Sequence, residues 1–252
     1  MDSRSVRKHF CFHFVARENS FIKRKLFSSV KIKYKIQWCF LKKKEKSNMN
    51  AYVERVIEET KKKNIIFIAG GLGTAPVYPQ VKWLHEHGVD VDVIMGFRSK
   101  DIIFYEEEMK AVAANVYVTT DDGSYAFHGN GSQQLEALVN DGKHYDVCVA
   151  IGPMIMMKFT ALLTKKLEIP TIVSMNPIMV DGTGMCGACR LMVGGEVKFA
   201  CVDGPEFDGH LVDFDQAMKR QQQYKTEEGR AKLAYEEGAT HHGGCGHCGG
   251  DK

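Results

Sequence analysis

The 252-residue chain is long enough for one large domain or two small ones, and its hydrophobic content of 44% suffices for a buried core. Its net charge of +3 is unevenly distributed, because residues 1–49 carry 14 Lys and Arg against 3 Asp and Glu. By difference, the remaining residues hold 20 basic and 28 acidic side chains, so the overall charge gives no support for nucleic-acid binding.

No segment approaches the roughly 20 apolar residues of a membrane span, and none has the apolar core and cleavage site of a signal peptide. Eight cysteines without a secretory signal indicate metal or redox use in a reducing compartment rather than a disulfide framework. We therefore expect a cytoplasmic protein that binds neither membranes nor nucleic acids.

Residues 1–50 form an atypical basic segment that contains no glycine or proline, although the whole chain has 24 and 6. A folded segment of that length nearly always needs turn residues. Three interpretations compete: a basic amphipathic arm, an organellar transit peptide, or a segment not selected to fold, such as an out-of-frame translation that ends near Met49. The third is favoured, so this segment is not expected to be a native domain.

Short apolar runs alternate with helix-like segments from residue 64 onward. Strands are expected within 64–70, 91–97, 115–120, 145–152 and 170–176, and helices follow within 74–88, 99–114, 131–142 and 153–168. This alternation predicts an α/β fold with a doubly wound parallel sheet, and residues 51–176 are expected to form an NAD(P)-binding domain.

Glycine-rich turns follow two of the predicted strands. In such sheets ligands bind beyond the carboxyl ends of the strands, where backbone N–H groups and helix N-termini can hold a diphosphate. A bland β–α turn is the alternative, and Pro76 stands where the Rossmann fingerprint has its third glycine, so a different class of nucleotide domain is indicated. The candidate cofactor-binding residues are Gly70, Gly71, Gly73, Thr74, Ala75 and Pro76, with Gly152, Pro153 and Met154 after the fourth strand.

Charged residues beyond the second and third strands bear on the choice of nucleotide. Asp121 or Asp122 can accept hydrogen bonds from an adenosine ribose and would repel a 2′-phosphate, which favours NAD(H) over NADP(H). A solvated Asp-Gly turn is the alternative. Arg98 and Lys100 have the opposite effect on the choice, because their positive charges would favour the 2′-phosphate of NADP(H).

Asp181, Cys186, Cys189 and Cys201 have the spacing D-x4-C-x2-C-x11-C. Plant-type ferredoxins bind a 2Fe–2S cluster with C-x4-C-x2-C, and Asp181 stands in the place of the first cysteine. Zinc sites more often join one close pair of ligands to another. A 2Fe–2S cluster with an oxygen ligand is favoured over zinc and over structural thiols. A nicotinamide carries two electrons and such a cluster one, so a flavin is needed on this chain or on a partner.

The segments "GGLGTAPVYPQVKWL", "GFRSKDIIFYEEEM", "TTDDGS", "AIGPMIMMKF" and "SMNPIMVDGTGMCGACRLMVGGEVKFACVDGPEFDGHLVDFD" resemble the small subunit of NADH-dependent reduced-ferredoxin:NADP oxidoreductase. More widely, they resemble the electron-transfer subunits of dihydroorotate dehydrogenase and of sulfide dehydrogenase. The resemblance implies a ferredoxin-reductase fold with FAD, a nicotinamide nucleotide, a 2Fe–2S subdomain at residues 177–215 and a larger flavin and iron–sulfur partner subunit. An oxygen ligand at Asp181 is typical of the ferredoxin:NADP group, whereas the dihydroorotate dehydrogenase group normally has cysteine there.

The family's N-terminal flavin barrel is not recognisable in this chain, so FAD binding by the chain alone is in doubt. We expect an NAD(P)H-dependent oxidoreductase subunit that passes electrons between the nucleotide, FAD and the partner. The alternatives are a truncated, non-catalytic remnant that binds nucleotide and metal, or a dihydroorotate dehydrogenase subunit of pyrimidine synthesis. Cys148, within a predicted strand, is expected to be a core residue rather than a redox thiol.

Residues 216–252 are expected to form a helical extension and a His/Cys tail. The tail holds a C-x2-C pair with flanking histidines, which suits a soft metal ion. Its glycine content and terminal position favour a solvated end that binds metal only adventitiously. The residues concerned are His241, His242, Cys245, His247 and Cys248.

Overall fold

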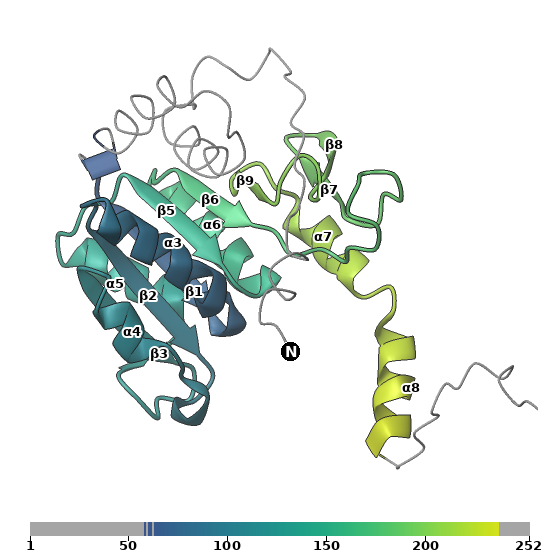
Figure 1. The fold of residues 1–252 in the computed structure, drawn as a ribbon, viewed down its shortest axis with the longest axis horizontal. Helices are drawn as coiled ribbons and strands as arrows, with labels where there is room; N and C mark the ends of the chain where they lie inside the picture. Colours follow the sequence, from purple (N-terminus) through teal and green to yellow (C-terminus); the bar gives the residue numbers. More distant parts are fainter. Residues whose placement is uncertain (1–57, 59, 62, 237–252) are drawn as a thin grey trace, which may run out of the picture.

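The computed structural model describes residues 58, 60, 61 and 63–236, so the basic segment 1–50 and the His/Cys tail lie outside the described residues. Within the described part, seven strands form one sheet in the order β4–β3–β2–β1–β5–β6–β9, and only β9 is antiparallel to its neighbour. The predicted doubly wound parallel sheet is thereby confirmed (Figure 1). The strands are β1 (Ile65–Gly70), β2 (Val91–Phe97), β3 (Asn115–Thr120), β4 (Phe127–His128), β5 (Val147–Ile151), β6 (Thr171–Ser174) and β9 (Glu206–Asp208).

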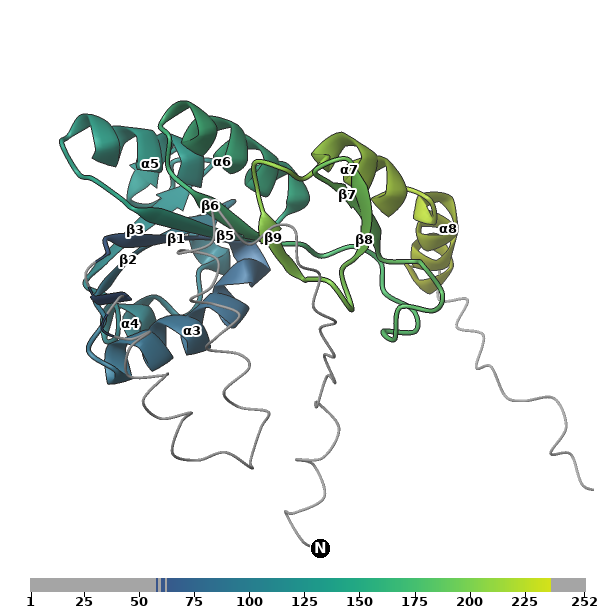
Figure 2. The same cartoon turned by 90° about the horizontal axis from the view of Figure 1, so that it is seen from above.

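Helices cover both faces of the sheet (Figure 2). α3 (Thr74–Glu86) and α4 (Glu106–Lys110) lie on one face, and α5 (Gly131–Asn140) and α6 (Met154–Lys166) lie on the other. Every residue of β1 is buried, and alternate side chains enter opposite cores. Ile66 and Ile68 pack with the α5–α6 side, whereas Ile65 and Phe67 pack with the α3 side, as expected for a parallel sheet covered on both faces.

The helix expected within 99–114 is shorter than its sequence pattern suggests. A single 3-10 turn, η3 (Lys100–Ile102), precedes α4, and Tyr105 between them has a left-handed backbone with φ of 60°. That conformation interrupts a right-handed helix. It places the Tyr105 ring 5.2 Å from the Tyr78 ring, while the Phe104 ring lies 5.6 Å from that of Phe97. The segment between η3 and α4 therefore packs its aromatic rings against α3 and β2 instead of continuing as a helix.

After β6 the chain leaves the sheet and forms the hairpin of β7 (Arg190–Val193) and β8 (Glu196–Phe199). It then returns as β9, which pairs with β6, so residues within the predicted cluster subdomain complete the sheet of the predicted nucleotide domain. α7 (Phe214–Gln221) packs against both α6 and β7.

α8 (Lys225–Glu236) is an exposed helix that extends away from the body and buries none of its residues (Figure 1). The expected helical extension is therefore present, divided into α7 and α8. None of the helices in the described ranges combines the length and apolar character needed to cross a bilayer.

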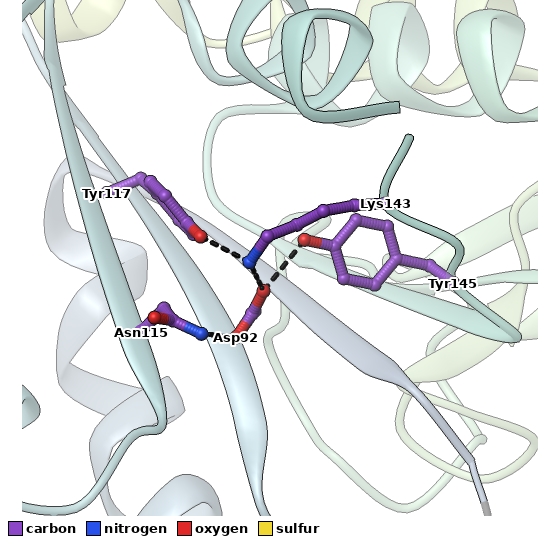
Figure 3. A network of polar contacts seen from close by, with 5 residues as sticks. All are labelled: Asp92, Asn115, Tyr117, Lys143 and Tyr145. Carbon is purple, nitrogen blue, oxygen red and sulfur yellow. Dashed lines mark hydrogen bonds and ion pairs between the residues drawn. The ribbon is translucent and has the colours of Figure 1, made fainter. Parts of the chain in front are cut away.

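A network of hydrogen bonds surrounds Asp92, the second residue of β2 (Figure 3). Asp92 accepts hydrogen bonds from Asn115 Nδ2 at 2.7 Å, from Lys143 Nζ at 2.8 Å and from Tyr145 Oη at 2.8 Å. Burial alone would raise the pKa of Asp92, but the hydrogen bonds from Lys143, Asn115 and Tyr145 hold this pKa below its usual range. The network ties β2 and β3 to the segment between α5 and β5.

Asp92→Ala is expected to lower the free energy of unfolding by about 2 to 4 kcal/mol at pH 7, because Tyr145 and Lys143 lose their shared acceptor. The native pKa of Asp92 is depressed, so its stabilisation is present above the unfolded carboxyl pKa of about 3.9 and is lost as pH falls through the native value. Urea unfolding at pH 7 and at pH 3 tests both statements. The exposed neighbour Asp90 is the control, and an equal loss in Asp90→Ala would contradict the assignment.

Candidate functional site

The parallel strands β1, β2, β3, β5 and β6 all end at one edge of the sheet. The sequence-predicted residues therefore gather at this edge: Gly70 ends β1, Arg98 follows β2, Asp121 follows β3 and Gly152 follows β5. The strand order reverses between β1 and β5, because β2 continues the sheet on one side of β1 and β5 on the other. Such a reversal is where doubly wound sheets form a ligand crevice.

The turns after β1 and β5 touch each other through their backbones. A Cβ on Gly73 would lie 2.1 Å from the Ile151 carbonyl oxygen, and a Cβ on Gly152 would lie 2.9 Å from the Gly70 nitrogen and Cα. A Cβ on Gly70 would lie 2.8 Å from Cδ of Pro153. These glycines are therefore required by packing between the turns, independently of any ligand.

The helices that start from these two turns have no side-chain caps. α3 begins after Gly73 and α6 after Pro153, and neither has a capping side chain or an acidic residue in its first turn. α5, by contrast, is closed by a capping box of Asn130 and Gln133. Uncapped N-termini leave backbone N–H groups that attract an anion.

Thr74, the first residue of α3, adds a polar atom at this position. Its side chain is fully buried, and its Oγ1 has no hydrogen-bond partner within the described structure. Ala75 and Pro76 continue the first turn and are exposed, while Met154 opens α6 and is buried. The Thr74 N–H donates to the Gly71 carbonyl of the preceding 3-10 turn η2 (Gly71–Gly73), and Pro76 has no N–H. The donors that remain for a diphosphate are the Thr74 hydroxyl and the N–H groups of the first turn of α6.

The two aspartates after β3 have different surroundings. The Asp122 carboxylate accepts hydrogen bonds from the Ser124 N–H at 2.9 Å and Oγ at 2.6 Å, and these bonds lower the pKa of Asp122. The Lys100 N–H donates in turn to Ser124 Oγ at 2.8 Å. The exposed Asp121 side chain has no hydrogen-bond or ion-pair partner among the described residues, so it remains available to a ligand.

Cys189 and Cys201 form the tighter half of the predicted metal centre. Both are buried and their sulfur atoms lie 3.2 Å apart. The Ala200 N–H donates to the Cys189 carbonyl at 3.1 Å, which holds the two segments together. Burial, followed by the neighbouring Cys189 thiol, raises the pKa of Cys201 to about 11. Two thiolates on one tetrahedral metal lie about 3.8 Å apart for metal–sulfur bonds of about 2.3 Å, so a small adjustment suits shared ligation.

Cys186 and Asp181 form the exposed half. The Ala188 N–H lies 3.5 Å from Cys186 Sγ, and backbone hydrogen bonds from Ala188 and Asp181 lower the pKa of Cys186 while the Asp181 charge opposes this shift. The Thr183 side chain and N–H both donate to Asp181 Oδ2, which lowers the pKa of this carboxyl. Asp181 is therefore an oriented carboxylate next to the Cys186 segment.

The four predicted ligands accordingly lie as two pairs. Among the described residues, no three His, Cys, Asp or Glu side chains converge closely enough to share one ion. A single zinc ion requires four donors around one point. Three thiols and one carboxylate are a donor set of the kind that binds iron or zinc.

Other residues near the site were not apparent from the sequence pattern. The Arg220 Nη2 donates to the Ala188 carbonyl at 3.2 Å from 32 positions away, and Asn176 Nδ2 donates to the Gly152 carbonyl at 3.4 Å. A local D-x-T pattern could have indicated Thr183, but no local signal marks Arg220. Cys148 is fully buried, and burial raises its pKa to about 12, which confirms it as a core residue.

Comparison with known proteins agrees with this geometry. A family model described as the iron–sulfur cluster binding domain of dihydroorotate dehydrogenase B matches residues 176–213. An uncharacterized protein in the adh 3′ region of Clostridium beijerinckii is 69% identical over 203 residues, which cover 80% of this chain and 68% of that protein. A Thermotoga maritima homolog of the dihydroorotate dehydrogenase B (NAD(+)) electron transfer subunit is 46% identical, over 69% of this chain and 60% of that protein. The chain belongs to this family of ferredoxin-reductase-like electron-transfer subunits.

A solved structure of the family extends the likeness to three dimensions. It was described for flavin-based electron bifurcation by NADH-dependent reduced ferredoxin-NADP oxidoreductase, and its chain is 43% identical with a TM-score of 0.63. The match covers 70% of this chain and 62% of that one. The present chain thus spans between about half and two thirds of the length of the family members compared.

Gly73→Ala is expected to lower the free energy of unfolding by about 1 to 3 kcal/mol, because the new methyl group would overlap the Ile151 carbonyl. Thermal unfolding measures the loss. Gly229→Ala is the matched control, since Gly229 lies in the exposed helix α8 with no atom within 4 Å of an added Cβ. It should be neutral or slightly stabilising. Equal behaviour of the two variants would show that the turns do not depend on Gly73.

Proposed function

We propose that this chain is the electron-transfer subunit of a flavin and iron–sulfur oxidoreductase, in which electrons pass between a nicotinamide nucleotide and a larger partner subunit. The observation that carries the proposal is the arrangement of one carboxylate and three thiols as two pairs beside a nucleotide-type sheet. Membership of the electron-transfer family supports it.

In the proposed metal centre, Cys189 and Cys201, with Asp181 and Cys186, would hold a 2Fe–2S cluster. A bound cluster supplies one-electron transfer. The chain's own contribution is to hold the ligands: Thr183 orients Asp181, and the Ala188 and Cys201 N–H groups point toward thiol sulfurs. Such amide contacts stabilise thiolates and help to set the potential of the group.

In the proposed nucleotide site, the first turns of α3 and α6 receive the diphosphate of NAD(H). The uncapped N–H groups of α6 and the buried, unpartnered Thr74 hydroxyl of α3 support this assignment. Asp121 accepts hydrogen bonds from the adenosine ribose, whereas Asp122 maintains the turn through Ser124. A carboxylate in that place repels a 2′-phosphate, so NAD(H) is preferred over NADP(H). The exposed Arg98 lies beside the same edge and binds phosphate oxygens.

The proposed reaction requires a flavin. Hydride transfer from a nicotinamide moves two electrons together, and a flavin supplies the conversion to single electrons. FAD is proposed on this chemical ground and on the resemblance, bound either by this chain or by the larger flavin and iron–sulfur partner subunit. The protein is proposed to act in the cytoplasm.

A dihydroorotate dehydrogenase electron-transfer subunit is the second candidate. The family model that matches residues 176–213 carries that description and favours it. Asp181 favours the ferredoxin:NADP group instead, because the resemblance associates an oxygen ligand with that group. Electron transfer from the reduced protein to ferredoxin supports the first candidate, and electron transfer from a dihydroorotate-oxidising partner to the oxidised protein supports the second.

Asp181→Ala is expected to lower the iron content and change the electron paramagnetic resonance spectrum of the reduced cluster, because one iron loses its oxygen ligand. Anaerobically purified wild-type protein should contain iron and acid-labile sulfide in equal amounts. The measurements are iron and sulfide analysis, visible absorption and electron paramagnetic resonance. Asp141→Ala, which removes an exposed carboxylate at the end of α5, should behave as wild type. Zinc in place of iron in the wild-type protein would contradict the proposed cluster.

Asp121→Asn is expected to reduce the preference for NADH over NADPH about tenfold, because it removes the charge that repels a 2′-phosphate, equivalent to about 1.4 kcal/mol. Fluorescence titration with both nucleotides measures the ratio of dissociation constants. Asp101→Asn controls for total charge, since Asp101 is an exposed carboxylate close to the same edge. An equal change in both variants, or no change in Asp121→Asn, would show that Asp121 does not bind the ribose.

A further inference from the structure

Arg220 reaches from the last turn of α7 to the turn between two predicted cluster ligands. Its Nη2 donates to the Ala188 carbonyl at 3.2 Å, and Ala188 directly precedes Cys189. An arginine near the end of a helix often satisfies the helix's own last carbonyls. Here the guanidinium donates to the cysteine loop instead.

The guanidinium of Arg220 is not fully satisfied within the described structure. Its Nε is buried and has no hydrogen-bond partner, and no carboxylate among the described residues forms an ion pair with it. The residue is partly buried, so the unpartnered Nε carries a desolvation cost. On the same helix Asp215 is paired with Lys158 at 2.6 Å. Arg220 therefore has an unpartnered buried donor next to its contact with the cysteine loop.

α7 holds Arg220 in place rather than leaving it on a mobile surface. Phe214 and Ala217 are buried on the inner side of the helix, and the Lys158–Asp215 ion pair fixes its first turn to α6. At the other end, Gln221 Nε2 donates to the Asn176 carbonyl at 3.1 Å. α7 lies beside the β7–β8 hairpin in both views (Figures 1 and 2).

We propose that Arg220 is a positioning residue that supplies the counter-charge to the iron–sulfur group and raises its reduction potential. The inference rests on the proposed 2Fe–2S cluster. Each thiolate and the Asp181 carboxylate bring one negative charge, and reduction of one ferric ion to ferrous adds one more without bond formation. A fixed cation behind the loop stabilises the reduced form more than the oxidised form. The Ala188 hydrogen bond also keeps the Cys186–Cys189 turn in its ligating shape.

The experiment is a redox titration of the purified, cluster-loaded protein with dithionite, followed by electron paramagnetic resonance. Arg220→Gln keeps much of the side-chain length and removes the charge, and it should disfavour reduction about tenfold, which is about 59 mV for a one-electron couple. Arg220→Lys keeps the positive charge but loses the planar guanidinium group, so it should shift the potential less than Arg220→Gln does. Lys219→Gln removes the same charge from the adjacent exposed position and is the matched control, with a potential close to wild type.

Equal potentials for Arg220→Gln and Lys219→Gln would overturn the proposal and leave Arg220 as a loop support only. Loss of the cluster in both Arg220 variants, with normal loading in Lys219→Gln, would also overturn the tuning role. Absence of any iron–sulfur signal in the wild-type protein would instead contradict the proposed function, which separates the two failures.

Discussion

The backbone contact between the turns after β1 and β5 is the constraint on which the rest of the site depends. Gly73 and Gly152 allow the two turns to meet without a side chain between them. This contact brings the uncapped starts of α3 and α6 together, although the two helices cover opposite faces of the sheet (Figure 2). The position proposed for the nucleotide diphosphate is therefore set by the packing of these two turns.

The same contact extends toward the cysteine loop. Asn176, just beyond β6, donates to the Gly152 carbonyl, and Gln221 of α7 donates to the Asn176 carbonyl. β9 returns to the sheet beside β6, so the cysteine-containing segment is attached at both of its ends. The proposed cluster and nucleotide sites are thus joined by short hydrogen-bonded links and a shared sheet, with no flexible linker between them.

Local patterns predicted the five parallel strands of the nucleotide domain, but not β4 or β9, which complete the sheet. The apolar runs, the glycine turns and the D-x4-C-x2-C sequence all act within a few residues of one another. The contributions of Asp92 and Arg220 were not predictable, because their partners lie 51 and 32 positions away and neither belongs to a repeating pattern. Asp121 and Asp122 look alike in sequence, and only the hydrogen bonds of Ser124 separate them. The predicted helix is shortened at Tyr105, whose backbone is left-handed and whose ring lies 5.2 Å from that of Tyr78.

The β7–β8 hairpin has a consequence for how this segment can vary in length. Cys189 and Cys201 flank the two strands, so their separation in space is set by strand pairing, from Arg190 opposite Phe199 to Val193 opposite Glu196. Residues Gly194 and Gly195 close the hairpin in left-handed conformations, and an added Cβ on Gly195 has no atom within 4 Å. Additional residues at this tip would lengthen the hairpin outward and leave the sulfur–sulfur distance unchanged. A single residue inserted within either strand would instead turn one thiol to the opposite face of the hairpin. The number of residues between Cys189 and Cys201 can therefore vary at the hairpin tip, and related chains with a longer tip can retain the same pair of ligands.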